Sequence, residues 1–84
     1  MFIGSSYTLT NPDRSMIGYK RIVIKDRVLS RTEERVRGEA SVTVTAYYYT
    51  LMCLVDGGDS AEIDEDEFQE EIMSGYYDLT GWGE

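Results

Sequence analysis

The sequence predicts an α+β fold in which a small three-stranded antiparallel sheet packs one face against a single acidic helix. Three observations predict this fold. Apolar and polar residues alternate from residue 40 onward, as in a strand with one solvated face. The β-branched run Ile22-Val23-Ile24 favours a second strand. Residues 63–75 combine helix-capping signals with an apolar stripe. The predicted elements are strands 1–9, 18–28 and 40–55 and helix 64–74, within a single domain, 1–84.

The first predicted strand is followed by a turn. Its apolar residues fall on one face at a period of two, namely Met1, Ile3, Tyr7 and Leu9. Asn11 and Pro12 then suit the first two positions of a type I turn. The chain is therefore expected to reverse direction before residue 18.

The second predicted strand carries positive charge on both faces, from Lys20, Arg21, Lys25 and Arg27. Such a strand is expected at a sheet edge, because Lys and Arg discourage edge-to-edge pairing. A docking surface for an acidic group is the alternative. After it, residues 30–33 fit the S-x-x-E capping pattern and Gly38 could end a short helix. A loop or single turn is equally compatible with this polar segment.

The third predicted strand changes character along its length. Val42, Val44 and Ala46 alternate with polar residues, whereas both faces are apolar from Tyr47 onward. That pattern predicts a central strand covered on both sides. Sixteen residues are long for one strand, so a bulge or bend is predicted between Tyr47 and Thr50.

The helix is predicted from its ends. Asp64 can be the N-cap, and Glu67 at N3 completes a capping box. Phe68 and Ile72 share one face, and Gly75 suits the left-handed position after the last turn. Ile63 and Phe68 also have the spacing of a hydrophobic staple.

Charge is divided unequally along the chain. Residues 1–55 hold all eight Lys and Arg against five acids, whereas residues 56–84 hold eleven acids and no base. The acidic half would repel phosphates, so direct binding of nucleic acid is not expected. It suits a basic protein surface instead, or it serves solubility alone. The predicted partner-binding residues are Asp59, Glu62, Asp64, Glu65, Asp66, Glu67, Glu70, Glu71, Tyr77 and Trp82.

The aromatic C-terminal end, Tyr76 to Trp82, has two interpretations. These side chains either close over the sheet and complete the core, or they present Tyr77 or Trp82 as a binding anchor.

Residues for catalysis are scarce. The chain has no His, which is the commonest general base and zinc ligand. Its one Cys, Cys53, lies in an apolar run and is expected to be a buried hydrophobic residue. We therefore expect no enzyme activity and no cofactor. Neither a secretory leader nor an apolar run long enough to span a membrane is evident, so a cytoplasmic protein without membrane contact is expected.

Segment 56–67 resembles the twelve-residue calcium loop of the EF-hand family. The matching positions one, five, eight, nine and twelve are Asp56, Ser60, Ile63, Asp64 and Glu67. Gly58 and Ala61 depart from the pattern at positions three and six. The resemblance implies calcium held by oxygen ligands.

These features predict a small acidic protein-binding inhibitor or adaptor. Carboxylates spread over a small scaffold can imitate a nucleic-acid backbone and block a DNA- or RNA-binding protein. In size and charge the chain is similar to small viral inhibitors of bacterial defence, anti-CRISPR proteins included. The alternatives are a calcium-binding module and a small structural subunit of a larger assembly. A monomer and a homodimer fit equally well.

Overall fold

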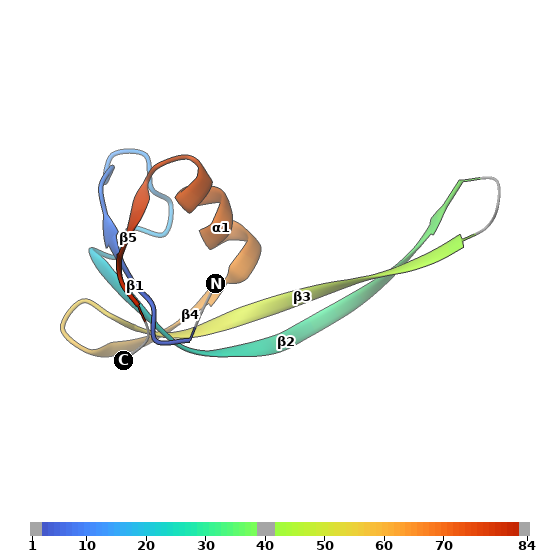
Figure 1. The fold of residues 1–84 in the computed structure, drawn as a ribbon, viewed down its shortest axis with the longest axis horizontal. Coiled ribbons are helices and arrows are strands. Elements are labelled where there is room, and N and C mark those ends of the chain that lie inside the picture. Colours follow the sequence, from blue (N-terminus) through green and yellow to red (C-terminus); the bar gives the residue numbers. More distant parts are fainter. Residues whose placement is uncertain (1–2, 39–41, 83–84) are drawn as a thin grey trace.

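A computed structural model describes residues 3–38 and 42–82, which form an antiparallel sheet with one helix on its face (Figure 1). The sheet order is β4-β3-β2-β1-β5, and every neighbouring pair is antiparallel. The elements in chain order are β1 (Ser6–Leu9), β2 (Arg21–Arg37), β3 (Val42–Val55), β4 (Asp59–Asp64), α1 (Glu65–Met73) and β5 (Tyr77–Gly81).

The α+β class is confirmed, but the predicted count of three strands is wrong, because the sheet has five. Strand β4 was missed because its acids conceal its alternation, in which Ala61 and Ile63 face the core. A turn with positive φ at Asp56 and Gly58 folds it back onto β3. Strand β5 was missed because the aromatic C-terminal end was assigned no regular structure.

The bounds of the predicted strands also change. Strand 1–9 shortens to β1, and its residues 1–2 lie outside the described part of the chain. Strand 18–28 extends as far as Arg37, so the segment 30–38 is neither a short helix nor a loop. Strand 40–55 begins at Val42 within the described residues. The turn at Asn11 is confirmed, since its carbonyl accepts the backbone N–H groups of Arg14 and Ser15.

The core lies between the sheet and α1, and its centre is aromatic. Phe68 is fully buried, and its ring meets those of Tyr7 and Tyr77 edge-on at 5.0 and 5.2 Å between centroids. Edge-to-face pairs of this kind add to the stabilisation that buried area provides. Side chains from β2, β3 and β4 complete the core, namely Ile22, Ile24, Leu51, Cys53, Val55 and Ile63.

Both predicted ends of the helix are confirmed. The Asp64 carboxylate accepts the backbone N–H of Glu67 at 3.1 Å, which makes it the N-cap. At the other end Gly75 has a φ of +80°. The N–H groups of Gly75 and Tyr76 donate to the carbonyls of Ile72 and Glu71. These two bonds form a Schellman motif, so local sequence defines this short helix.

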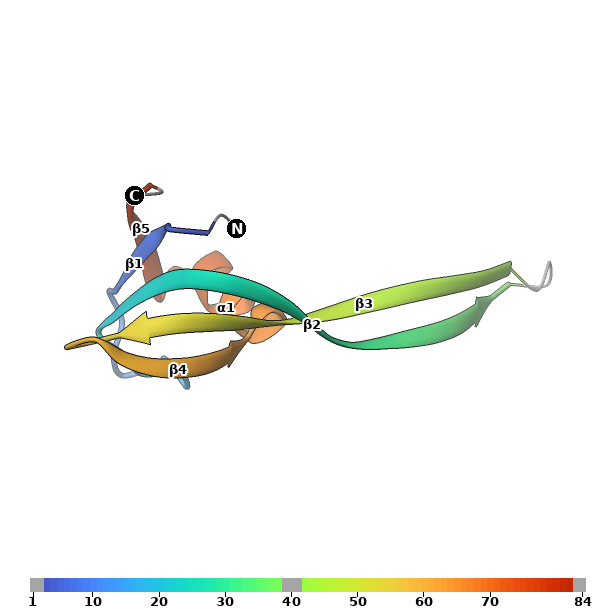
Figure 2. The same cartoon turned by 90° about the horizontal axis from the view of Figure 1, so that it is seen from below.

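Strands β2 and β3 run on together well beyond the rest of the sheet (Figures 1 and 2). We call residues 29–37 of β2 and 42–49 of β3 the arm, and the rest of the described chain the body. The molecule measures 49 × 25 × 19 Å, and its radius of gyration is 15.1 Å. A compact chain of this length would have a radius of gyration of about 12 Å, so the arm accounts for the elongation.

Two bulges in β2 shape this hairpin. The register shifts between Ile24 and Asp26 and again between Leu29 and Arg31, each time against a continuous β3. The predicted irregularity near Tyr47–Thr50 therefore exists, but the extra residue, Ser30, belongs to the partner strand. Bulges increase the local twist, and the two strands cross where the arm leaves the body (Figure 2). The prediction that 18–28 is an edge strand is wrong for residues 21–24, which lie between β3 and β1, whereas from Lys25 onward no described strand pairs with that side of β2.

Candidate protein-binding surfaces

The structure places six of the ten predicted partner-binding residues as exposed carboxylates on β4 and α1. They are Asp59, Glu62, Asp64, Asp66, Glu67 and Glu70. Within the described residues, none of the ion pairs involves these six side chains. We call this set the acidic surface. Because the strand alternates, Glu62 and Asp64 share one side of β4 while Asp59 lies on the other.

Glu65 is not part of the acidic surface, because it is buried against the sheet. Arg27 binds its carboxylate through two nitrogens: Nη2 donates to Oε1 at 2.8 Å, and Nε donates to Oε2. The same guanidinium stacks on Tyr49, 3.5 Å from the ring centroid. The Glu65 carboxylate therefore raises the pKa of Arg27 and anchors the start of α1 to the base of the arm. The alternative interpretation of β2, a docking surface for an acidic group, thus finds such a group within the same chain.

Glu71 is the second acid that the fold buries. Its Oε1 accepts a hydrogen bond from the Ser15 hydroxyl, and its Oε2 accepts the backbone N–H of Ile17 at 3.1 Å. Glu71 therefore fixes the loop between β1 and β2 onto the end of α1. Both oxygens of Glu71 are thus engaged inside the fold, and the residue also lines the hollow beside α1.

The two predicted aromatic anchors differ in their placement. Tyr77 is 1% exposed and its hydroxyl donates to the carbonyl of Tyr19 at 2.6 Å, so it completes the core instead of binding a partner. Burial raises its pKa. Trp82 is 66% exposed at the end of β5 and keeps its place as a predicted anchor.

A hollow adjoins the acidic surface between α1 and the loop that follows β1. Glu67 and Glu70 line one side, Arg14 and Met16 line the other, and Tyr76 contributes its ring. The hollow has a volume of about 280 Å³, and Met16 is exposed at its rim. Carboxylates beside an aromatic ring and a thioether suit a long cationic side chain, whose stem is apolar and whose end is charged.

Segment 56–67, which resembles a calcium loop, consists of a turn at 56–58, strand β4 and the first residues of α1. Asp56 accepts the backbone N–H groups of Lys20 and Arg21 through Oδ1. Strand β4 then extends from Asp59 to Asp64, which turns successive side chains to opposite faces. Among residues 3–38 and 42–82, no three His, Cys, Asp or Glu side chains are placed to hold a metal ion. The continuous loop that the resemblance implies is not formed, because residues 59–64 are a strand.

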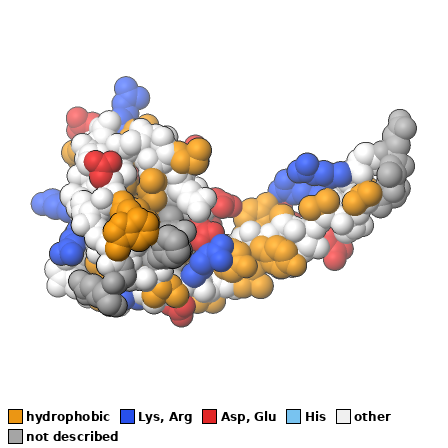
Figure 3. Space-filling model, in the orientation of Figure 1, with side chains coloured by type: hydrophobic (Ala, Val, Ile, Leu, Met, Phe, Trp, Pro, Cys, Tyr) orange, Lys and Arg blue, Asp and Glu red, His pale blue; other side chains and the backbone are white. Residues whose placement is uncertain are grey.

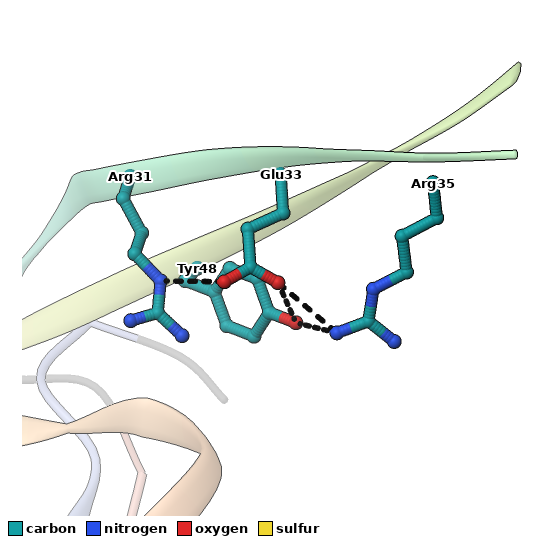
Figure 4. Close-up of polar contacts among 4 residues, drawn as sticks. All are labelled: Arg31, Glu33, Arg35 and Tyr48. Carbon is teal, nitrogen blue, oxygen red and sulfur yellow. Dashed lines mark hydrogen bonds and ion pairs between the residues drawn. The ribbon is translucent and has the colours of Figure 1, made fainter.

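The arm carries a polar cluster on one face (Figure 4). Glu33 lies between Arg31 and Arg35, at 3.5 Å from the Nε of Arg31 and 3.0 Å from the Nη2 of Arg35. The Tyr48 hydroxyl joins it, donating to Glu33 at 3.2 Å and accepting from Arg35 at 2.8 Å. The hydrogen bond from Arg35 lowers the pKa of Glu33. The three charges thus satisfy one another.

The arm also exposes apolar side chains that the sequence analysis did not select. Its exposed apolar residues are Leu29, Val36, Val42, Val44 and Tyr47, and Tyr47 is 59% exposed. Figure 3 shows orange side chains along the arm, next to blue and red ones. The prediction that 47–55 is covered on both sides is wrong in the arm. The sequence did contain a signal for this exposure. Val42, Val44 and Ala46 alternate with polar residues, but only one helix is predicted, and it is too short to cover the whole strand.

Cys53 lies in the core as expected, and its thiol donates to the Leu51 carbonyl. Burial raises the pKa of the thiol to about 11, which makes it a weak nucleophile. α1, the one helix among the described residues, is too short to cross a membrane.

Comparison of the chain with known protein families, with curated proteins and with solved structures found no match.

Proposed function

We propose that this protein is a non-enzymatic, cytoplasmic adaptor or inhibitor that binds a basic protein through its acidic surface. The observation that supports the proposal is the exposure of six carboxylates on adjoining elements, β4 and α1. Residues 56–84 contain no Lys or Arg to neutralise them. A field of one sign accelerates association with a partner of opposite charge and is weakened by salt.

The hollow beside α1 supplies a specific contact for this surface. A Lys or Arg side chain of the partner would enter between Glu67 and Glu70, with its stem against Met16 and Tyr76. Arg14 on the opposite wall would repel a badly placed cation and so define the direction of entry. Trp82 offers a second, apolar contact on β5.

The partner we favour is a nucleic-acid-binding protein, because its binding groove is already built for a row of negative charges. Occupation of that groove by the acidic surface would inhibit the partner. Glu65 is bound inside the fold by Arg27, and Glu71, whose oxygens are engaged by the loop after β1, contributes only to the lining of the hollow. The carboxylates that would imitate phosphates are therefore the six of the acidic surface and not all eleven acids of residues 56–84.

The test is affinity capture from a lysate of the natural host, with partners identified by mass spectrometry. The test variant changes Asp66, Glu67 and Glu70 to Lys, which leaves the internal contacts of Glu65 and Glu71 intact. The matched control changes Asp13, Asp26 and Asp78 to Lys, since these are exposed acids outside the acidic surface and the net charge changes equally. We expect the partner to be lost with the test variant and kept with the control.

Equal capture by both variants would remove the acidic surface from the proposal. Loss with both variants would show that net charge alone holds the partner. If the captured protein binds nucleic acid, added DNA or RNA should compete with the protein for it.

A second candidate function, a structural subunit of a larger assembly, is favoured by the arm. The arm is a two-stranded ribbon that extends beyond the body and exposes apolar side chains. Neighbouring chains of an assembly could cover them.

A further inference from the structure

We propose that the arm binds a second copy of this chain. In this dimer the outer edge of β3 in one copy pairs antiparallel with the same edge in the other, which gives a four-stranded ribbon in the order β2-β3-β3-β2. The inference concerns a different surface from the acidic one and does not depend on the proposed function.

The unpaired edge of β3 is the starting point. Strand β4 pairs with β3 from Thr50 to Val55 and β2 pairs with its other side along its whole length. No strand among the described residues borders the outer edge at 42–49. Alternate residues of such an edge direct N–H and C=O groups outward, and these groups form a template for another strand.

The two edges of the arm are protected very differently. The β2 edge carries five charged residues between Leu29 and Arg37 and is interrupted by the bulge at Ser30. Charges and bulges are the devices that keep edges from pairing. The β3 edge reads Val42-Thr-Val-Thr-Ala-Tyr-Tyr-Tyr49, without a charge, a proline or a bulge. Its residues are mostly β-branched or aromatic, which favours strand pairing. The chain therefore leaves open one edge and closes the other.

A second copy suits this edge for reasons of symmetry. Antiparallel pairing of a strand with its own copy places a twofold axis perpendicular to the ribbon, which is the commonest symmetry of soluble dimers. Each side chain then meets one from the same uncharged run, so no like charges face each other. The centre of 42–49 lies at Thr45 and Ala46, so Thr45 lies directly opposite or diagonal to its own copy.

The distribution of charge supports the same arrangement. Each chain has a net charge of −8, which opposes association of the bodies. Antiparallel arms place the two bodies at opposite ends of the ribbon, about 26 Å apart for eight overlapping residues. This distance exceeds the Debye length of about 8 Å at physiological salt.

Dimerisation would also stabilise the folded structure of the arm. A two-stranded hairpin is marginally stable alone in water, whereas additional strands with shared side-chain contacts stabilise it. In the four-stranded ribbon, Val44 and Tyr47 gain cross-strand neighbours from the second copy, and each such pair contributes roughly 0.2–1 kcal/mol.

The test compares two substitutions in sedimentation equilibrium over micromolar to submillimolar concentrations. Thr45→Lys places like charges near each other across the twofold axis. Thr32→Lys makes the same chemical change on the same face of the arm, but on β2, away from the new contact. We expect a dimer for the natural sequence, a dissociation constant raised about fivefold or more by Thr45→Lys, and no comparable change for Thr32→Lys.

A charge swap completes the experiment. An equal mixture of Thr45→Lys and Thr45→Glu chains should associate more tightly than either variant alone, because Lys then faces Glu. Circular dichroism checks that each variant is folded. A monomer at every concentration, a dimer that Thr45→Lys leaves unchanged, or equal weakening by both Lys variants would overturn the proposal. Capture of a partner through the acidic surface would be unaffected by any of these results.

Discussion

Glu65 shows how the role of a single residue depends on its distant partner. Its carboxylate is buried, yet Arg27 satisfies both oxygens and covers Tyr49 at the same time. Replacing Arg27 alone would leave a buried carboxylate without its partner, which is costlier than replacing both residues by apolar ones. The pair therefore fixes the orientation of α1 to the arm more than it adds net stability.

Glu33 gives a pH-dependent prediction for the arm. Hydrogen bonds from Arg35 hold its pKa below the usual value, so the contribution of the cluster is present above the pKa of unfolded Glu. It is lost as the pH falls through the lower, folded pKa. In amide NMR spectra, the signals of Arg31, Glu33 and Arg35 should shift together as the pH falls below the usual range of a Glu side chain. Glu33→Gln should abolish the shift, and a shift that persists in this variant would contradict the assignment.

At the scale of elements, α1 has ends that its own sequence defines. The Asp64 cap and the Schellman bonds at Gly75 join consecutive residues, so the sequence analysis could place both ends. The acidic first turn also suits the positive end of the helix dipole.

Removal of this cap has a predictable cost. Asp64→Ala should lower the free energy of unfolding by about 1 kcal/mol, because the N–H of Glu67 loses its acceptor. Chemical denaturation measures the change. Asp64→Asn is the control, since it retains a capping oxygen and should lose much less. An equal loss in both variants would mean that the charge of Asp64, and not its cap, stabilises the helix.

Long-range contacts mark the limit of what the sequence could predict. The burial of Glu65 depends on Arg27, 38 positions away, and that of Glu71 depends on Ser15, 56 positions away. No local pattern encodes such partners, so both acids were assigned to the surface. The acidic strand β4 was missed because charge, not alternation, dominates its sequence. Tyr47 was placed in a covered strand because apolar content alone does not distinguish a core from an exposed arm.

At the scale of the whole molecule, the body and the arm differ in what holds them together. The body has a helix over five strands and an aromatic core, whereas the arm has two strands and one polar cluster. Local opening is easiest where buried apolar contacts are few. The two parts should therefore open independently.

Hydrogen exchange tests this difference in solution dilute enough to dissociate the proposed dimer. Arm amides, such as those of Val44 and Arg35, should exchange about tenfold or more faster than those of Ile24 and Cys53. The Thr45→Lys variant is the matched sample for concentrated solution. Equal protection of the amides in the arm and in the body would contradict independent opening of the two parts. If the dimer forms, the arm amides of the natural sequence should exchange more slowly in concentrated solution than those of the Thr45→Lys variant.

The bulge at Ser30 also bears on how the arm could change in length through evolution. Leu29 pairs with Tyr49 and Arg31 pairs with Tyr48, so deletion of Ser30 alone would leave these pairs in place and would only remove the extra twist of the bulge. Deletion of any other single residue from one strand of the arm would instead turn the side chains beyond it to the opposite face. Removal of two residues from each strand would preserve the faces and shorten the arm by about 7 Å. In related chains, we therefore expect insertions and deletions in the arm to occur in such matched steps or to consist of the bulge residue Ser30 itself.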